Sequence, residues 1–344
     1  MRAAVFNAPF DVTVEELADP VIQKPTDAIV SVSATCVCGS DLWYYRGESS
    51  HHAGGPIGHE FIGVVEEVGA EVTGVKVGEF VIVPFMWNDG TCPHCLHGIT
   101  SSCLHGGIWS SPGANGGQGE YVRVPEASGT LVVVPGGVPD ARLIPSLLTL
   151  SDVMGTGHHA AIGGGVVPGA TVAVVGDGAV GLCAILAARR LGAGRIIALS
   201  RNPARQSVAR AFGATDILEE RGDDAVAAVL DLTNGIGVDA TLECVGTAQA
   251  FATAFEIARP GSRVGFVGVP HGVEVPVRRA FADNIGLGGG LAPVRRYLPE
   301  LLADVLAGKI NPGLVFDYEF DFENLAGAYQ AMDGRRAIKA IARF

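Results

Sequence analysis

Four side chains that can bind a metal lie within fifteen residues of one another, namely Asp89, Cys92, Cys95 and Cys103. Thiolates and a carboxylate suit tetrahedral zinc, so these residues predict a structural zinc that would replace a hydrophobic core in a long loop. Asp89 is the weaker member because it also fits a turn before Gly90, and water, His94 or His97 would then complete the ligands. A metal-free lobe with free thiols is the remaining alternative.

Cys38, His59 and Asp152 form a second candidate set of metal ligands. They are far apart in the sequence, so spacing alone does not join them. Each also has an ordinary interpretation, as a small core residue, a hydrogen-bonded core histidine and a helix cap, respectively. From the residues alone, a joint metal site and these separate ordinary roles both stay open.

A glycine-rich segment follows an uninterrupted apolar run at 170–175 and opens an apolar helical pattern, with the sequence Gly176-Asp177-Gly178-Ala179-Val180-Gly181. The first glycine suits a tight turn, the second a close approach to a pyrophosphate, and the third close packing of helix on strand. The helix amino terminus then faces the negative charge. The segment predicts a dinucleotide site, and its alternative is a glycine-rich turn without a ligand.

The end of the second strand of such a unit selects the cofactor, since an acidic residue there binds a ribose 2′-hydroxyl. Here the chain has Ser200-Arg201, and no Asp or Glu occurs between Gly181 and Asp216. Arg201, with Ser200 and Arg205, is therefore predicted to hold the 2′-phosphate of NADP, with NAD also possible. The alternative is that Arg201 is a solvated residue at a helix start.

The elements that must position these residues divide the chain into two patterns. Short strands rich in Val, Ile and Phe are predicted at 28–34, 61–68 and 77–83, with a loop at 89–119 and a helix at 146–161. Strands then alternate with helices at 170–175, 179–191, 195–199, 203–212, 239–244 and 263–267, and a last helix is predicted at 297–307. The first pattern predicts a bent β-rich sheet, and the second a doubly wound parallel sheet.

Composition narrows the class of protein. The 344 residues suit about two domains, and 24 basic against 36 acidic residues give a net charge of −12. This balance excludes nucleic acid or an anionic membrane as the main partner. Residues 153–176 carry no charge but hold many glycines, so they predict a buried joint rather than a membrane span. Seven clustered cysteines without a signal segment predict metal ligands in a cytoplasmic protein, with Cys36, Cys183 and Cys244 left to packing.

Taken together, these motifs resemble those of the zinc-dependent medium-chain alcohol dehydrogenases over essentially the whole chain. The resemblance is carried by Cys38-Gly39-Ser40-Asp41, Gly58-His59-Glu60, the segment from Asp89 to Cys103, Ser151-Asp152 with Thr156-Gly157, and the loop from Gly176 to Gly181. It implies an α/β protein with a chaperonin-10-like β-rich catalytic domain, residues 1–154 and 294–344. A Rossmann domain with a doubly wound parallel sheet is implied for residues 155–293.

The resemblance also implies roles for individual residues. Catalytic zinc is expected on Cys38, His59 and Asp152, with Glu60 as an outer or transient fourth ligand. Asp41 would orient His59 through its other ring nitrogen. Ser40 would lie beside the substrate oxygen, Thr156 beside the nicotinamide, and Lys339 near the cofactor pyrophosphate.

Three departures from the family pattern are visible. Asp89 replaces the usual first cysteine of the structural site, and Ser200-Arg201 replaces the acidic residue that selects NAD. Trp43 stands where many members have a proton-relay histidine, so the proton must leave Ser40 through ribose hydroxyls, water, or a side chain such as His51 or His52.

We therefore expect a reversible zinc-dependent alcohol dehydrogenase that takes a small-molecule alcohol or carbonyl substrate, primary, secondary, polyol or terpenoid, and forms a homodimer or homotetramer. Two alternatives are a zinc-independent reductase of quinones or enones on the same fold, and a non-enzymatic nucleotide-binding protein with structural zinc only. The joint presence of Cys38, His59 and Asp152 counts against both.

Overall fold

The computed structural model describes residues 1–110 and 114–344, which divide into two units. Unit 1 comprises Met1–Asp152 and Pro293–Phe344, and unit 2 comprises Val153–Ala292. The sequence prediction placed the first boundary after residue 154 and the second before residue 294. In the described part of the chain, none of the helices is both long and apolar enough to cross a membrane.

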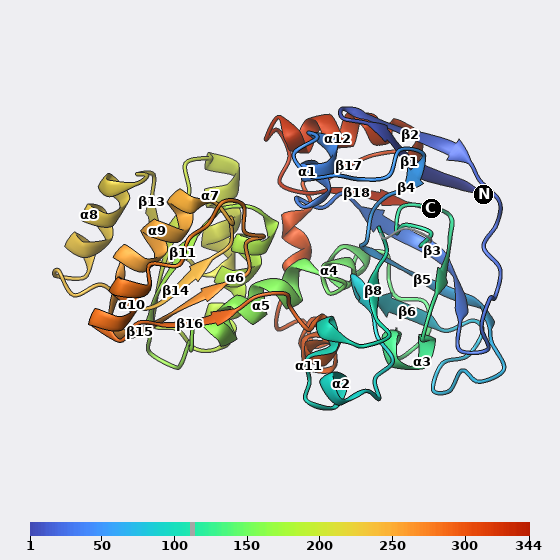
Figure 1. The fold of residues 1–344 in the computed structure, drawn as a ribbon, viewed down its shortest axis with the longest axis horizontal. Helices are drawn as coiled ribbons and strands as arrows, with labels where there is room; N and C mark the ends of the chain where they lie inside the picture. Colours follow the sequence, from blue (N-terminus) through green and yellow to red (C-terminus); the bar gives the residue numbers. More distant parts are fainter. Residues whose placement is uncertain (111–113) are drawn as a thin grey trace. The chain divides into compact units, whose positions relative to one another are not determined.

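Unit 1 is built on antiparallel strands (Figure 1). Its main sheet has the order β10-β6-β5-β3-β18-β17, with β9 also paired to β3, and smaller sheets have the orders β2-β1-β4 and β7-β8. The strands are β1 (Arg2–Ala8), β2 (Asp11–Glu16), β3 (Ala28–Cys36), β4 (Gly55–Pro56), β5 (Phe61–Val68), β6 (Phe80–Val83), β7 (Met86–Trp87), β8 (Gly107–Ile108), β9 (Tyr121–Val124), β10 (Val132–Val133), β17 (Tyr318–Glu319) and β18 (Ala340–Arg343). The helices are α1 (Asp41–Tyr45), α2 (Pro93–Leu96), α3 (Ala127–Thr130), α4 (Ile144–Thr149), α11 (Val294–Leu306) and α12 (Leu325–Asp333), with 3-10 turns at Thr100–Ser102, Pro312–Val315 and Phe322–Asn324.

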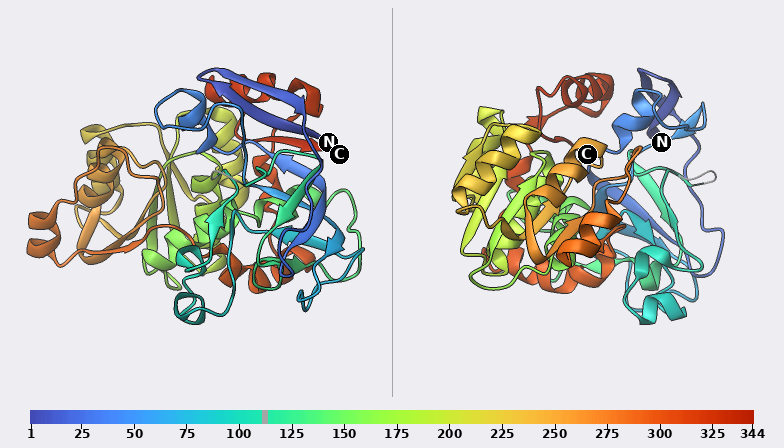
Figure 2. Two further views of the ribbon diagram at one scale, coloured as in Figure 1. Left: turned by 45° about the vertical axis from the view of Figure 1, so that its right-hand side comes forward. Right: turned by 60° about the vertical axis from the view of Figure 1, so that its left-hand side comes forward.

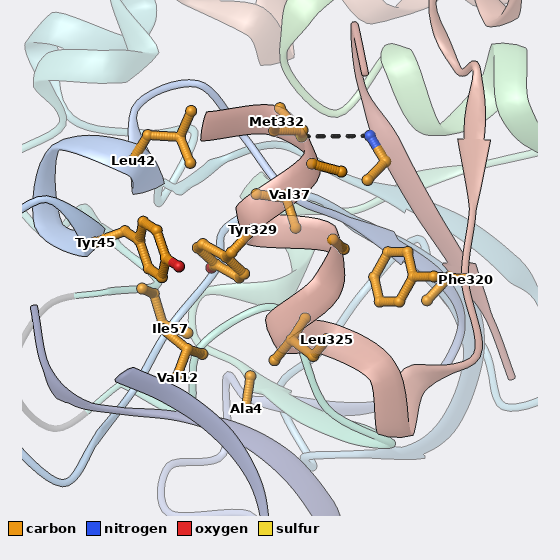
Figure 3. Packing of buried hydrophobic residues seen from close by; sticks show 14 of the residues in the cluster. Ala4, Val12, Val37, Leu42, Tyr45, Ile57, Phe320, Leu325, Tyr329 and Met332 are labelled. Atoms are coloured by element: carbon orange, nitrogen blue, oxygen red, sulfur yellow. Dashed lines mark hydrogen bonds between the residues drawn. The ribbon is translucent and has the colours of Figure 1, made fainter. Parts of the chain in front are cut away.

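The last part of the chain completes the core of unit 1. Helix α12 packs its apolar face against residues from the first 57 positions, among them Val12, Tyr45 and Ile57, as Figure 3 shows. Strand β18 pairs with β3, so that Ile341 lies opposite Cys36. Burying these side chains together is the main stabilising contribution, and it requires both ends of the chain.

Unit 2 is a parallel sheet with the strand order β13-β12-β11-β14-β15-β16. Helices α5, α6 and α7 lie on one face, and α8, α9 and α10 on the other (Figures 1 and 2). The elements are α5 (Val153–Gly163), β11 (Thr171–Val175), α6 (Ala179–Arg190), β12 (Arg195–Leu199), α7 (Pro203–Phe212), β13 (Asp216–Leu218), α8 (Asp223–Leu232), β14 (Val238–Glu243), α9 (Ala248–Glu256), β15 (Ala258–Phe266), α10 (Val277–Asp283) and β16 (Gly286–Gly289). This is the doubly wound sheet that the alternating pattern predicted.

Several predicted elements need correction. The single helix predicted at 146–161 is wrong, because α4 ends at Thr149 and α5 begins at Val153. The strand predicted at 77–83 begins only at Phe80, since Gly78 has φ +86° and residues 76–79 form a turn. The segment predicted as a loop at 89–119 contains short helices and strand β8. In unit 2, β13, α8, α9, α10 and β16 were not predicted.

Candidate metal centres and nucleotide site

Strand register brings the distant ligands of the second set together. Thr35 near the end of β3 lies opposite Phe61 at the start of β5. Cys38 comes shortly after Thr35 and His59 shortly before Phe61, so both ligands lie near this pair. Phe61 is also opposite Val83 of β6. Two residues beyond β6, the amide of Phe85 donates to the carbonyl of Ser151 at 2.8 Å, and this bond places Asp152 at the same spot.

Three donor atoms of different chemistry converge there. Asp152 Oδ2 lies 3.8 Å from Cys38 Sγ and 3.4 Å from His59 Nε2. Tetrahedral zinc with bonds of 2.0–2.3 Å separates its ligand atoms by roughly 3.3–3.8 Å. With one Glu60 oxygen added, all four ligand atoms lie within 4.8 Å of one another. These residues therefore fit a zinc ion.

Buried polar atoms around the cluster support that fit. Glu60 and Asp41 are fully buried and His59 is 3% exposed, a costly environment for polar groups unless a partner offsets the loss of water. Within the described residues, Glu60 Oε2 has no hydrogen-bond partner. His59 Nδ1 lies 3.1 Å from Asp41 Oδ1, and Asp41 Oδ2 accepts the amide of Cys38 at 2.9 Å. Asp41 thus lies beside the Nδ1 atom of His59, and its role in orienting the ring stays a prediction.

The protonation of the cluster follows from its burial and its charges. Burial is the main cause that raises the pKa of the Cys38 thiol above its ordinary value, with Glu60 adding to it. Burial works against charge on His59, but Asp41 and Cys38 outweigh it and raise the pKa of the imidazole well above its usual range. A cation at this point would displace those protons, because only a thiolate and a neutral imidazole bind metal.

Lys339 lies at this cluster. Its ammonium donates to Glu60 Oε1 at 2.6 Å and to the carbonyl of Val37 at 3.2 Å, and the residue is 1% exposed. It takes this place because Ala340, which follows it, opens β18 beside β3. The interaction of its charge with Glu60 was not predicted from the sequence, and its contact with a cofactor pyrophosphate stays a prediction.

Ser40 borders the same centre. Ser40 Oγ is 3.4 Å from His59 Nε2. Trp43 lies half-buried on α1. The ring of His51 packs against Phe6 and Tyr44 at 5.2 and 4.9 Å, and its Nε2 lies 3.3 Å from the carbonyl of Pro56. His51 is therefore directed at a backbone carbonyl, and a route for protons from Ser40 through it stays a prediction.

The cysteine lobe gathers its four predicted ligands as well. One oxygen of Asp89 and the sulfurs of Cys92, Cys95 and Cys103 lie within 4.8 Å of one another, and Cys92 Sγ is 3.9 Å from Cys103 Sγ. Asp89 Oδ1 also accepts the amides of Thr91 and Cys92, at 2.8 and 2.9 Å.

His105 adds a partner that the spacing did not reveal, with Nδ1 2.6 Å from Asp89 Oδ2. The two histidines named as alternative ligands are directed elsewhere. His94 Nδ1 lies 2.6 Å from the carbonyl of Ser102, and His97 Nδ1 2.7 Å from that of Pro93. The donor set fits a structural zinc, and the amides on Asp89 lower the pKa of its carboxyl against the effect of burial.

The glycine-rich loop lies between β11 and α6 at the carboxyl edge of the sheet. Gly176 has φ +117°, which favours glycine, and a Cβ on Gly181 would be 2.0 Å from the carbonyl of Gly176. A Cβ on Gly178 would meet nothing within 4 Å, which leaves room for a pyrophosphate above the amides of Ala179 and Val180 at the start of α6. Thr156 is half-buried on α5.

The residues predicted to bind a 2′-phosphate follow β12. Arg201 is exposed. Ser200 and Arg205 instead contact Asp177 of the glycine-rich loop, with Ser200 Oγ donating to Oδ2 at 2.9 Å and Arg205 Nη1 to Oδ1 at 3.2 Å. The sequence prediction considered only carboxylates after Gly181. Asp177 comes before Gly181 in the sequence, yet its side chain lies beside the end of β12.

A β-rich unit with a thiolate, imidazole and carboxylate set, together with a Rossmann unit, defines the class of metal-dependent dehydrogenases. Two family models match, the alcohol dehydrogenase GroES-like domain at residues 24–136 and the zinc-binding dehydrogenase at residues 179–306. The chain belongs to the family of zinc-dependent medium-chain alcohol dehydrogenases and is an enzyme. The recognition of this family and the predicted fold class are thereby confirmed.

Individual relatives agree with this assignment. The chain is 33% identical to zinc-type alcohol dehydrogenase B of Aspergillus flavus, over 99% of this chain and 81% of the relative. It is 34% identical to an NADP-dependent isopropanol dehydrogenase of Thermoanaerobacter brockii, over 90% of this chain and 89% of the relative. The solved structure of the alcohol dehydrogenase TADH from Thermus sp. ATN1 matches with a TM-score of 0.90 and 35% identity, covering 100% of this chain and 99% of that one.

Proposed function

We propose that this enzyme transfers a hydride reversibly between an alcohol and a nicotinamide cofactor at a zinc held by Cys38, His59 and Asp152. The observation that carries the proposal is the convergence of these three donors at 3.4–3.8 Å beside a buried Glu60. A zinc-independent reductase would have no use for such a set. If zinc were bound only in the cysteine lobe, Asp152 in the break between α4 and α5 would have no function.

The roles of the surrounding residues follow from their positions. When bound, zinc supplies a Lewis acid that polarises the substrate oxygen. Ser40 Oγ lies 3.4 Å from His59 Nε2, and we propose that it accepts the proton of the alcohol and passes it outward. Asp41 holds His59 in the orientation that presents Nε2. Glu60 with Lys339 forms a charge pair behind the ligands.

For the cofactor, we infer NADP(H) with NAD(H) also accepted. Arg201 is exposed after β12, where a 2′-phosphate would lie, and its guanidinium can bind a phosphate through paired donors. Gly176, Gly178 and Gly181, with the amides of Ala179 and Val180, would receive the pyrophosphate. Thr156 is proposed beside the nicotinamide.

The setting of the enzyme is proposed as well. We infer a small alcohol or carbonyl as substrate, a homodimer or homotetramer, and no nucleic-acid or membrane partner, in keeping with the net charge of −12. The thiolate ligands favour the cytoplasm, because a reducing compartment keeps thiols available to zinc.

The first prediction tests the catalytic metal. Asp152→Ala should lower alcohol oxidation on the order of a hundredfold or more, because one of three zinc ligands is lost. It should also remove about one zinc per chain. Asp140→Ala is the matched control, since that carboxylate pairs only with Arg142 on an exposed segment among the described contacts.

Turnover is followed by the absorbance of the reduced cofactor with a panel of primary and secondary alcohols, and zinc by elemental analysis. Near-normal turnover and a full metal content in Asp152→Ala would overturn the assignment. Activity that survives complete removal of zinc by a chelator would favour the zinc-independent alternative.

A further inference from the structure

Asp177 occupies a place in the nucleotide site that neither the glycine motif nor the cofactor prediction requires. It is the second residue of the glycine-rich loop, and any residue fits the motif there. Yet its side chain is 8% exposed and contacts two residues that follow β12. A buried carboxylate is costly unless its partners are fixed, so this contact organises the edge of the sheet.

The first consequence concerns the hydroxyl of Ser200. A serine hydroxyl has one proton to donate and lone pairs to accept. Ser200 Oγ gives that proton to Asp177 Oδ2 at 2.9 Å. Ser200 is itself 1% exposed, so a nucleotide that reaches this hydroxyl meets its lone pairs rather than a donor. Such an oxygen can accept a hydrogen bond from the 2′-hydroxyl of NAD(H), but it cannot donate one to the 2′-phosphate of NADP(H).

The second consequence concerns Arg205. Its Nη1 donates to Asp177 Oδ1 at 3.2 Å and to the Asp177 carbonyl at 3.3 Å, and the residue is 7% exposed. Asn202 Oδ1 caps the same helix by accepting the amides of Ala204 and Arg205. The charge of Arg205 is thus neutralised by Asp177 and fixed by α7, which leaves Arg201 as the exposed cation of this set.

We propose that Asp177 determines cofactor specificity, by holding Ser200 as an acceptor and neutralising Arg205, so that NAD(H) is retained beside NADP(H). The inference rests on the proposed dehydrogenase function and deepens it. In this arrangement, Arg201 alone attracts the 2′-phosphate, and the carboxylate of Asp177 limits that attraction.

The test measures binding of NAD+ and NADP+ to the zinc-loaded protein by calorimetry, together with the specificity constants for both. Asp177→Asn should raise the preference for NADP+ over NAD+ about tenfold, because a cation is released and an anion removed. Ser200→Ala should weaken NAD+ more than NADP+. A serine that donates to the phosphate would give the opposite order.

The matched control is Asp216→Asn. Asp216 pairs with Arg195 at 2.8 Å in the same unit, but at the first residues of β13 and β12, the opposite edge of the sheet. The substitution removes the same charge from an arginine pair and should change the preference for NADP+ over NAD+ less than twofold. Arg201→Ala should weaken NADP+ and leave NAD+ nearly unchanged.

The outcomes separate the two proposals. A wild-type protein that binds neither nucleotide would overturn the proposed function. Binding of both with an unchanged preference in Asp177→Asn would overturn only the role of Asp177. If Asp177→Asn does not fold, Ser200→Ala decides, and a selective loss of NADP+ affinity in that variant would sink the inference.

Discussion

Asp89 makes two kinds of contact through its two carboxylate oxygens. One carboxylate oxygen accepts two backbone amides and closes the turn at 89–92, while the other meets His105. The carboxylate also lies within the ligand set of the lobe. His105 is exposed, so we expect it to orient Asp89 rather than to fill a core. Orientation of a ligand by a hydrogen-bonded neighbour is worth about ten- to a hundredfold in metal affinity.

A third prediction, after those on the catalytic zinc and on Asp177, concerns the two roles proposed for Asp89, as a turn residue and as a zinc ligand. Asp89→Asn can keep the amide contacts through its oxygen but loses the charge, so zinc in the lobe should bind more weakly, by on the order of tenfold or more, in a folded protein. His105→Ala should give a smaller weakening, and His97→Ala, which touches only the Pro93 carbonyl among the described contacts, should give none. Zinc transfer to a chromogenic chelator measures all three. Equal zinc retention in wild type and Asp89→Asn would show that Asp89 is only a turn residue.

Residue types and the family resemblance together predicted much of the candidate site, because few side chains bind zinc and each has a limited set of partners. Cys38, His59 and Asp152 were named from chemistry and family resemblance, and the structure brings them together. The pairs Lys339 with Glu60 and Asp177 with Arg205 were not predicted. Both join residues whose proximity depends on strand order, which no local pattern encodes.

At the scale of elements, the break between α4 and α5 determines where Asp152 lies. The apolar run at 146–161 reads as one helix, since its periodicity continues through the break. The amides of Ser151 and Asp152 instead bond the carbonyls of Leu148 and Thr149, and the carbonyl of Ser151 accepts from Phe85. A tertiary bond to the strand region thus overrides local helix preference. The parallel sheet was easier to predict because buried strands alternate with helices of ordinary length.

Asp239 joins three strands at the amino end of that sheet. Its Oδ2 accepts the amide of Thr171 on β11 and its Oδ1 accepts Arg259 Nε on β15, both at 2.7 Å. Burial works to raise the pKa of this carboxyl, but the amide and then Arg259 outweigh it and lower the pKa. A depressed pKa means that the stabilisation is present above the unfolded value of about 3.9 and is lost as pH falls through the folded value.

The fourth prediction is that Asp239→Asn lowers the free energy of unfolding at pH 7 by about 0.5–1.5 kcal/mol, a value reduced by the exposure of the pair. The difference from wild type should shrink as pH falls below about 4, because the carboxyl of the unfolded chain takes up a proton first, and it should vanish below the lowered pKa of the folded protein. Thermal unfolding at pH 7 and pH 3.5 measures it, with Asp11→Asn as control, because that exposed carboxylate has no side-chain partner among the described contacts. A difference that grows at the lower pH would contradict the sign.

At the scale of the whole molecule, the exposed apolar side chains are unevenly distributed. Five of them fall within residues 275–291, namely Val275, Val277, Phe281, Leu287 and Leu291. Helix α10 has no buried residue, and Phe281 on it is 86% exposed. Next to it in the chain, β16 is the last strand in the order of its sheet, paired with β15. An edge strand beside exposed apolar surface favours association with another chain.

The fifth prediction is that the proposed homo-oligomer forms through α10 and the edge of β16. Phe281→Glu should shift the protein to a smaller species at micromolar concentration, because a charge replaces an apolar contact at the centre of the interface. Val138→Glu is the matched control. Val138 is 68% exposed but belongs to unit 1, so its substitution should leave the mass unchanged. Light scattering coupled to gel filtration gives the masses, and circular dichroism checks that the variant is folded. A Phe281→Glu protein with the wild-type mass would show that the subunit contact lies elsewhere. A monomeric wild type would show that no homo-oligomer forms.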